Sequence, residues 1–180
     1  MNPTRRRFTT SLPVLGAMML GARHGGLLAQ TTPAAMEAVA PPLPVVGTTL
    51  TLPEVALFDG TVFKPEQAKG RITLIYWWAS TCPFCALQSP EMQKLWQAQQ
   101  AHGLRMLALS VDKKPADAVA YLQKKGYTFP AAWVTPDIHK VLPKPRGLPV
   151  TLVLGRDGRV LQAERGQMFP EDVAQLASWL

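Results

Sequence analysis

Residues 72–85 read ITLIYWWASTCPFC, and this segment carries the clearest sign of the fold. Its first part, Ile72–Trp78, is an unbroken apolar run rich in β-branched and aromatic residues. Such a run is typical of a strand that is buried on both faces, as in a parallel sheet. Two cysteines, Cys82 and Cys85, follow it directly, and the chain contains no others. We therefore expect a buried strand that ends at a pair of thiols.

Strands and helices alternate along the rest of the chain. We expect further strands over Thr49–Leu57, Arg105–Val111, Val150–Leu154 and Arg159–Ala163, and helices over Ser89–His102, Pro115–Lys125 and Pro170–Leu180, with a short helix or turn near Asp137–Leu142. Gly103 and Gly126 mark the ends of two of these helices. Strand–helix–strand units imply parallel pairing, and the late hairpin around Gly155–Gly158 adds antiparallel strands. The sequence thus predicts an α/β fold with a mixed central sheet and helices on both faces.

The first 29 residues have the pattern of an export signal. Arg5 to Arg7 precede Phe8, which resembles the twin-arginine signal, although Thr9 and Thr10 follow where that signal usually has Leu-Lys. The apolar run Leu12–Ala22 is too short to cross a hydrocarbon core of about 30 Å. We expect a signal peptide over 1–29, a flexible Ala/Pro-rich linker over 30–44 and one domain over 45–180. The protein is then periplasmic, or membrane-tethered if the leader is not cleaved.

Composition and charge exclude several classes of protein. The chain is 47% hydrophobic and 17% charged, which is typical of a globular protein and not of a disordered one. Its formal net charge is +7, but residues 1–29 hold four arginines and no acidic residue, so the remainder carries 15 basic and 12 acidic residues. These charges are scattered. They indicate a solvated surface, not a nucleic-acid site, which would need clustered basic residues interleaved with aromatic ones.

The spacing of Cys82 and Cys85 indicates redox chemistry. A disulfide that closes a four-residue loop stabilises a fold little, because the entropic gain grows with loop length. Thiol–disulfide exchange does need two adjacent thiols: one attacks a partner's disulfide, and the second resolves the mixed disulfide. A helix that starts at Cys82 would stabilise its thiolate, and Pro83 presets the first helical turn. We expect Cys82 to be the nucleophile and Cys85, one turn deeper, the resolving thiol.

Haem attachment and zinc binding also use cysteine pairs, but this sequence lacks the other residues that those sites require. Haem attachment needs a histidine directly after the second cysteine, and Ala86 is there. A closed zinc site needs four ligands, and the sequence has no second pair. No nucleotide, flavin or metal motif is visible. We therefore expect no cofactor and no metal, with the cysteine pair itself as the redox group.

Two motifs resemble a known family. Residues 77–85 (WWASTCPFC), with Pro90 after them, and residues 147–158 (GLPVTLVLGRDG) are similar to exported thioredoxin-like proteins of the TlpA/ResA type. The resemblance implies a thioredoxin-like fold, a protein-disulfide reductase and a cis peptide bond between Leu148 and Pro149 that faces the cysteines. It also implies a docking surface from Trp78, Pro83, Phe84, Leu148 and Pro149. Partners would be exported proteins with disulfides or dithiols, and a membrane or periplasmic redox partner that recycles the pair.

The sequence departs from the family at three positions. Tyr76 stands where thioredoxin has a buried aspartate, Gln88 where many exported relatives have a glutamate, and Thr81 where a tryptophan usually precedes the first cysteine. Both acidic groups that could accept the proton of the resolving thiol are thus absent. Less negative charge near the pair also favours the thiolate and a more oxidising disulfide. An oxidant or isomerase of the same fold is therefore an alternative to a reductase.

A second alternative comes from another class of protein. Cys82, Cys85 and His139 could together bind copper in a non-enzymatic chaperone. A thiol peroxidase is less supported, because the residues before Cys82 lack the usual peroxidatic Pro/Thr setting.

Overall fold

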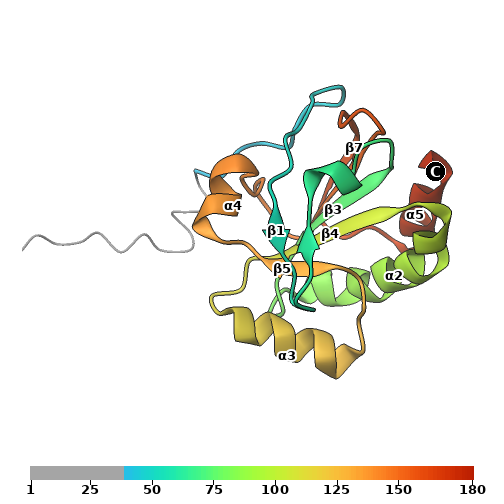
Figure 1. Ribbon diagram of the computed structural model, residues 1–180. Helices are drawn as coiled ribbons and strands as arrows, with labels where there is room; N and C mark the ends of the chain where they lie inside the picture. The colour runs from blue at the N-terminus through green and yellow to red at the C-terminus, as the bar shows by residue number, and fades with distance from the viewer. Residues whose placement is uncertain (1–38) are drawn as a thin grey trace, which may run out of the picture. The chain divides into compact units, whose positions relative to one another are not determined.

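A mixed five-stranded sheet in the order β5-β4-β3-β6-β7 organises residues 39–180, the part of the chain that the computed structural model describes (Figure 1). Its central strand β3 (Thr73–Trp78) pairs parallel with β4 (Arg105–Ser110) and antiparallel with β6 (Val150–Leu154). β4 pairs parallel with β5 (Ala131–Trp133), and β6 pairs antiparallel with β7 (Val160–Arg165). All six residues of β3 are buried. The predicted mixed sheet around a doubly buried strand is therefore confirmed.

Helices cover both faces of the sheet. The remaining elements are β1 (Val55–Ala56), β2 (Val62–Phe63), η1 (Pro65–Gln67), α2 (Pro83–Gln99), η2 (Gln100–His102), α3 (Pro115–Lys125), α4 (Pro136–Val141), α5 (Pro170–Gln175) and η3 (Leu176–Trp179). One core packs α2, α3 and α5 against the side of β3 that carries Tyr76. The other packs α4 and the β1–β2 hairpin against the side that carries Trp77. The two cores exist because successive side chains of a strand point to opposite faces.

The helix after the cysteines begins at the cysteine pair, as expected, and is continuous with the segment expected as a helix over Ser89–His102. α2 starts at Pro83, directly after Cys82, and continues through Pro90. Cys82 occupies the N-cap, and its sulfur accepts a hydrogen bond from the backbone N–H of Cys85. Pro83 is in the first turn, which confirms the expected helix start at the cysteine pair. Burial of one face of α2 holds the helix together across Pro90.

Three other segments differ from the expectation. Of the strand expected over Thr49–Leu57, only Val55–Ala56 (β1) is a strand, and Thr49 forms an isolated bridge to Arg159. The proline-rich connection contains the short strand β5, which pairs with the carboxyl end of β4 over only three positions. The C-terminal helix is α5 followed by the 3₁₀ turn η3. By contrast, α3 has the predicted bounds and ends at Gly126, whose φ of 67° suits a residue without a side chain.

The N-terminal boundaries fall largely outside the described residues. The predicted signal over 1–29 and the linker up to residue 38 lie there. Within the rest of the predicted linker, the carbonyl of Pro41 accepts a hydrogen bond from the N–H of Arg146, and Leu43 packs against the core on the α4 side. Between residues 39 and 180, none of the helices has the length and apolar character needed to cross a membrane.

Candidate active site

The carboxyl end of β3 and the first turn of α2 hold the two thiols. Cys82 is half-buried, whereas Cys85 is only 1% exposed. The Sγ of Cys82 lies 3.2 Å from the backbone nitrogen of Cys85, which donates to it. This N–H is one of the free donors at the helix start, where the helix dipole also favours negative charge. Cys82 is therefore the more accessible of the two sulfurs, and it lies at the N-terminus of α2.

Cys85 lies behind Cys82 in the core between β3 and α2. Burial raises the pKa of the Cys85 thiol, and its hydrogen bond with Cys82 raises that pKa further. The inner sulfur thus stays protonated under conditions in which an exposed cysteine would ionise. The two neighbouring thiols therefore differ: that of Cys82 is partly exposed to solvent, and that of Cys85 is buried and stays protonated to higher pH.

An apolar hollow opens beside the cysteine pair. Phe84, between the two cysteines, and Leu148 both line a cavity of about 350 Å³, and Phe169 completes its rim. Phe84 and Phe169 are 55% and 61% exposed, so this rim presents two aromatic rings to solvent. Exposed aromatic side chains around a cavity are typical of a surface that receives a partner.

Four of the five predicted docking residues border this region. Pro83 and Phe84 are exposed, Leu148 is half-buried, and Pro149 is buried behind it. The Leu148–Pro149 peptide bond is cis, as the resemblance implied. Trp78 differs, because its side chain is fully buried and packs against Tyr121 and Phe129. Trp78 therefore lies beneath this surface, and its part in docking stays a prediction.

Two neutral polar side chains, those of Tyr76 and Gln88, lie in the core near the cysteine pair. The hydroxyl of Tyr76, at the thioredoxin aspartate position, lies 3.0 Å from that of Ser89, and burial raises its pKa well above 10.0. Gln88 is fully buried; its Nε2 donates to Thr151 Oγ1 and its Oε1 accepts from the backbone N–H of Met168. Gln88 thus ties α2 to β6 and to the segment before α5. Neither residue is acidic, so the expected lack of a carboxylate at these two positions holds in three dimensions.

A carboxylate that sequence reasoning missed positions the loop before Cys82. Asp112 is only 7% exposed and accepts hydrogen bonds from Ser80 N–H, Ser80 Oγ and Ser110 Oγ. Its own carbonyl accepts a hydrogen bond from Nε1 of Trp133 at 2.7 Å. Only its place directly after a predicted strand, followed by lysines, was visible in the sequence, and that pattern is equally typical of a surface loop. Asp112 fixes the chain at Ser80, two residues before Cys82.

The arrangement does not favour the copper alternative. His139 is exposed on α4, which packs on the other face of the sheet from Cys85. Among residues 39–180, no three histidine, cysteine or acidic side chains come together as metal ligands.

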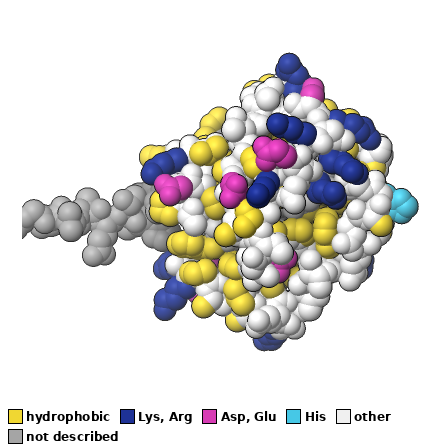
Figure 2. Space-filling model, in the orientation of Figure 1, with side chains coloured by type: hydrophobic (Ala, Val, Ile, Leu, Met, Phe, Trp, Pro, Cys, Tyr) yellow, Lys and Arg dark blue, Asp and Glu magenta, His cyan; other side chains and the backbone are white. Residues whose placement is uncertain are grey.

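On the face shown in Figure 2, Lys and Arg side chains lie among acidic and uncharged ones.

Comparison with known proteins agrees with this geometry. Residues 46–163 match the model of the AhpC/TSA family. The chain belongs to the AhpC/TSA family. It is 26% identical over 131 residues to the thiol-disulfide oxidoreductase ResA of Geobacillus thermodenitrificans, a match that covers 69% of this chain and 73% of that protein. This member of the AhpC/TSA family is therefore an enzyme, a thiol–disulfide oxidoreductase with the pair Cys82–Cys85.

Solved structures give the same fold. A thioredoxin-family thiol:disulfide interchange protein from Chlorobium tepidum has a TM-score of 0.68 at 18% identity, over 75% of this chain and 97% of that one. A secreted disulfide oxidoreductase from Mycobacterium tuberculosis has a TM-score of 0.62 at 14% identity, over 71% of this chain and 95% of that one. The predicted thioredoxin-like α/β fold is confirmed.

Proposed function

We propose that this enzyme is an exported protein-disulfide reductase in which Cys82 attacks and Cys85 resolves. The observation that carries the proposal is the contrast between the two thiols: the half-buried sulfur at the helix start against the buried one behind it. Pro83, Phe84, Leu148 and Pro149 form the docking surface. The apolar hollow between Phe84 and Leu148 receives the partner, whose backbone pairs with that of Leu148.

The reaction transfers two electrons and two protons to the partner. The thiolate of Cys82 attacks one sulfur of the partner's disulfide, and the other sulfur leaves as a thiolate that takes up a proton. Cys85 then loses its proton and attacks the sulfur of Cys82. This step closes the Cys82–Cys85 disulfide and releases the second partner sulfur, which is protonated in turn. A dithiol of a membrane or periplasmic partner reduces the enzyme for the next cycle.

Export to the periplasm is part of the same proposal. Its support is the arginine-rich pattern of residues 1–29, which precedes an Ala/Pro-rich linker. A structurally similar protein from Mycobacterium tuberculosis is described as secreted. Fractionation of cells that express the full chain should recover it outside the cytoplasm, and replacement of Arg5, Arg6 and Arg7 by lysine should retain it inside.

Trapping of partners tests the reductase mechanism. Cys85→Ser should accumulate mixed disulfides with proteins of the export compartment, because the second step is blocked. Cys82→Ser should form no adducts and should not reduce insulin disulfides. Insulin reduction by Cys82→Ser at the wild-type rate would contradict the assigned order of attack.

The opposite direction of electron flow has one observation in its favour. Tyr76 and Gln88 occupy the two positions at which an acidic proton acceptor would lie, and both side chains are neutral. The pKa of Cys85 is raised by burial and by its hydrogen bond with Cys82, not by a carboxylate. The reduction potential separates the two directions. A value near about −270 mV favours a reductase, whereas one near about −120 mV favours an oxidant.

A further inference from the structure

β7 is an edge strand, and from Ala163 onward its outer backbone groups have no partner among residues 39–180. It is the last strand of the sheet, and it runs toward the cavity that Arg165 and Phe84 line. The N–H of Gly166 donates to the carbonyl of Pro149. This bond shows which positions of β6 and β7 form the hydrogen-bonded pairs. In an antiparallel pair, hydrogen-bonded positions alternate with positions whose N–H and C=O point away from the partner strand. Ala163 and Arg165 are therefore the positions that point outward.

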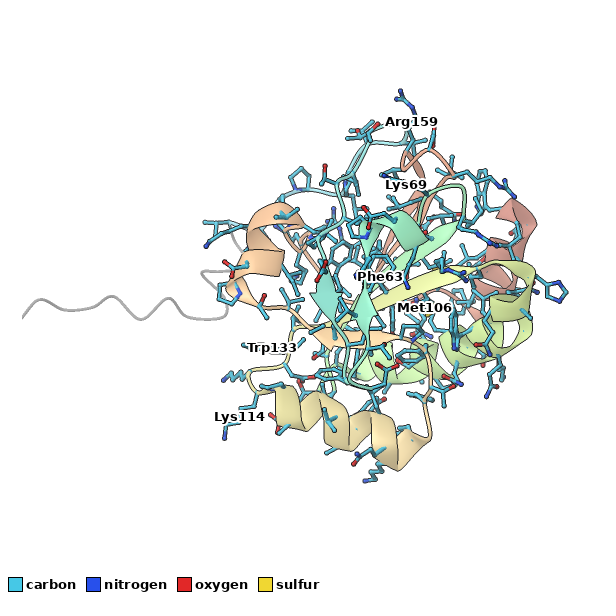
Figure 3. The ribbon with its side chains drawn as sticks, viewed as in Figure 1. Phe63, Lys69, Met106, Lys114, Trp133 and Arg159 are labelled. Atoms are coloured by element: carbon cyan, nitrogen blue, oxygen red, sulfur yellow. The ribbon has the colours of Figure 1, made fainter. Side chains whose placement is uncertain are left out.

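Another segment of the same chain already pairs with the start of this edge. Gly47 N–H donates to the carbonyl of Val160 at 2.8 Å, and Val160 N–H donates to the carbonyl of Thr48 at 2.9 Å. Arg159, at the tip of the hairpin (Figure 3), adds a bond from Nη1 to the carbonyl of Gly47. The edge therefore accepts an extended segment at Val160. From Ala163 onward, no backbone partner within residues 39–180 occupies it.

A groove joins this free edge to the cysteine site. A second cavity, of about 420 Å³, lies between β7 and the α5–η3 segment, and Gln162 and Glu164 line it from β7. It shares Arg165, Gly166, Gln167 and Phe169 with the apolar hollow next to Phe84. A strand added to β7 would place alternate side chains in the second cavity, while its end reaches the hollow beside Cys82.

The residues that line the second cavity favour a bound segment with polar side chains. Gln162 accepts from Nε1 of Trp179 and donates to a carboxylate oxygen of Glu164. Within the described residues no lysine, arginine or histidine forms an ion pair with Glu164. The half-buried carboxylate therefore favours a basic side chain opposite it.

We propose that β7 binds an extended segment of the protein whose disulfide reacts with Cys82. The segment adds as a strand beyond Ala163, with polar residues at alternate positions and a basic one facing Glu164. This inference rests on the proposed function and deepens it. The enzyme would then prefer disulfides in unfolded or extended chains to those in small molecules or compact loops.

Proline at Ala163 is the sharpest test. The N–H of Ala163 points outward, so Ala163→Pro removes a donor from the free edge without breaking the ladder to β6, and edge strands tolerate proline. Ala163→Ser keeps the N–H and serves as the matched control. Two substrates are compared with the reduced full chain: glutathione disulfide, and a mixed disulfide of glutathione with an extended peptide that carries lysine at alternate positions.

Loss of one neutral hydrogen bond predicts about a fivefold lower kcat/KM for the extended peptide with Ala163→Pro. Glutathione disulfide should react at the wild-type rate, and Ala163→Ser should match the wild type with both substrates. Equal kcat/KM of Ala163→Pro and wild type for the extended peptide would overturn the inference. So would a concentration-dependent dimer that Ala163→Pro abolishes, because a second copy would then occupy the edge.

Two further measurements keep the result interpretable. If Ala163→Pro does not fold, the wild-type chain is tested with the lysine peptide and with its glutamate counterpart. A preference for lysine that Glu164→Gln abolishes supports the inference, and equal rates overturn it. If the wild type reduces neither peptide nor glutathione disulfide, the proposed function itself fails.

Discussion

Replacement of Asp112 by alanine should destabilise the domain by about 3 kcal/mol. The carboxylate accepts bonds of 2.8–3.0 Å from three donors: the N–H and Oγ of Ser80, and the Oγ of Ser110. Bonds to a charged acceptor contribute about 1.5–3 kcal/mol each. Ser110 is fully buried and would lose its acceptor, whereas half-buried Ser80 can turn to water. The removed carboxylate also no longer has to be desolvated, which lowers the sum to about 3 kcal/mol.

Urea unfolding of the reduced protein measures this effect. With a slope of about 2 kcal/mol per molar urea, the midpoint should fall by about 1.5 M. Asp112→Asn keeps the shape and one acceptor oxygen, so we expect a loss of about 1 kcal/mol. The freed loop should also change the rate at which iodoacetamide alkylates Cys82. An unchanged midpoint for Asp112→Ala would refute the reasoning that this carboxylate holds the loop before the nucleophile.

Three further predictions concern the buried groups and His139. The reduced protein should lose stability as pH rises above 9.0, the ordinary pKa of cysteine, because folded Cys85 keeps a proton that the unfolded chain releases. The slope is at most about 1.4 kcal/mol per pH unit and should shrink in Cys85→Ser, as urea midpoints across this pH range can show. Gln88→Glu should make the reduction potential more negative in a glutathione titration, since added negative charge near the pair disfavours a thiolate in its reduced form. Gln88→Leu should mainly destabilise the fold through the unpaired N–H of Met168. His139→Ala should leave the copper affinity of the reduced protein unchanged in a titration, because His139 is exposed on α4; a large loss would revive the copper site.

Local patterns were sufficient where one segment determines its own structure. The apolar run of β3, the bounds of α3 and the glycine that ends it all follow from residues close in sequence. The start of α2 at the cysteine pair was expected, but its continuity through Pro90 was not, because a proline inside a helix usually breaks it. β5 is only three residues long, and it forms because β4 offers it a partner. Such elements depend on tertiary contacts, which spacing along the chain does not contain.

The candidate site divides in the same way. The order of the thiols, one outer and one inner, follows from where a strand ends and a helix begins. The burial of Trp78 and the reach of Asp112 to Ser80 depend on how distant segments pack. The groove along β7 likewise joins residues from β7, the following loop and the C-terminal segment.

A redox titration of the intact protein tests most directly whether the two sulfurs act as one unit. The chain is equilibrated in glutathione buffers of graded potential, quenched with acid, and alkylated after denaturation; mass spectrometry then counts the free thiols. We predict that Cys82 and Cys85 disappear together at one potential, with the loss of two hydrogens. Two free thiols at every potential, or the loss of only one of them to glutathione, would contradict a redox-active pair.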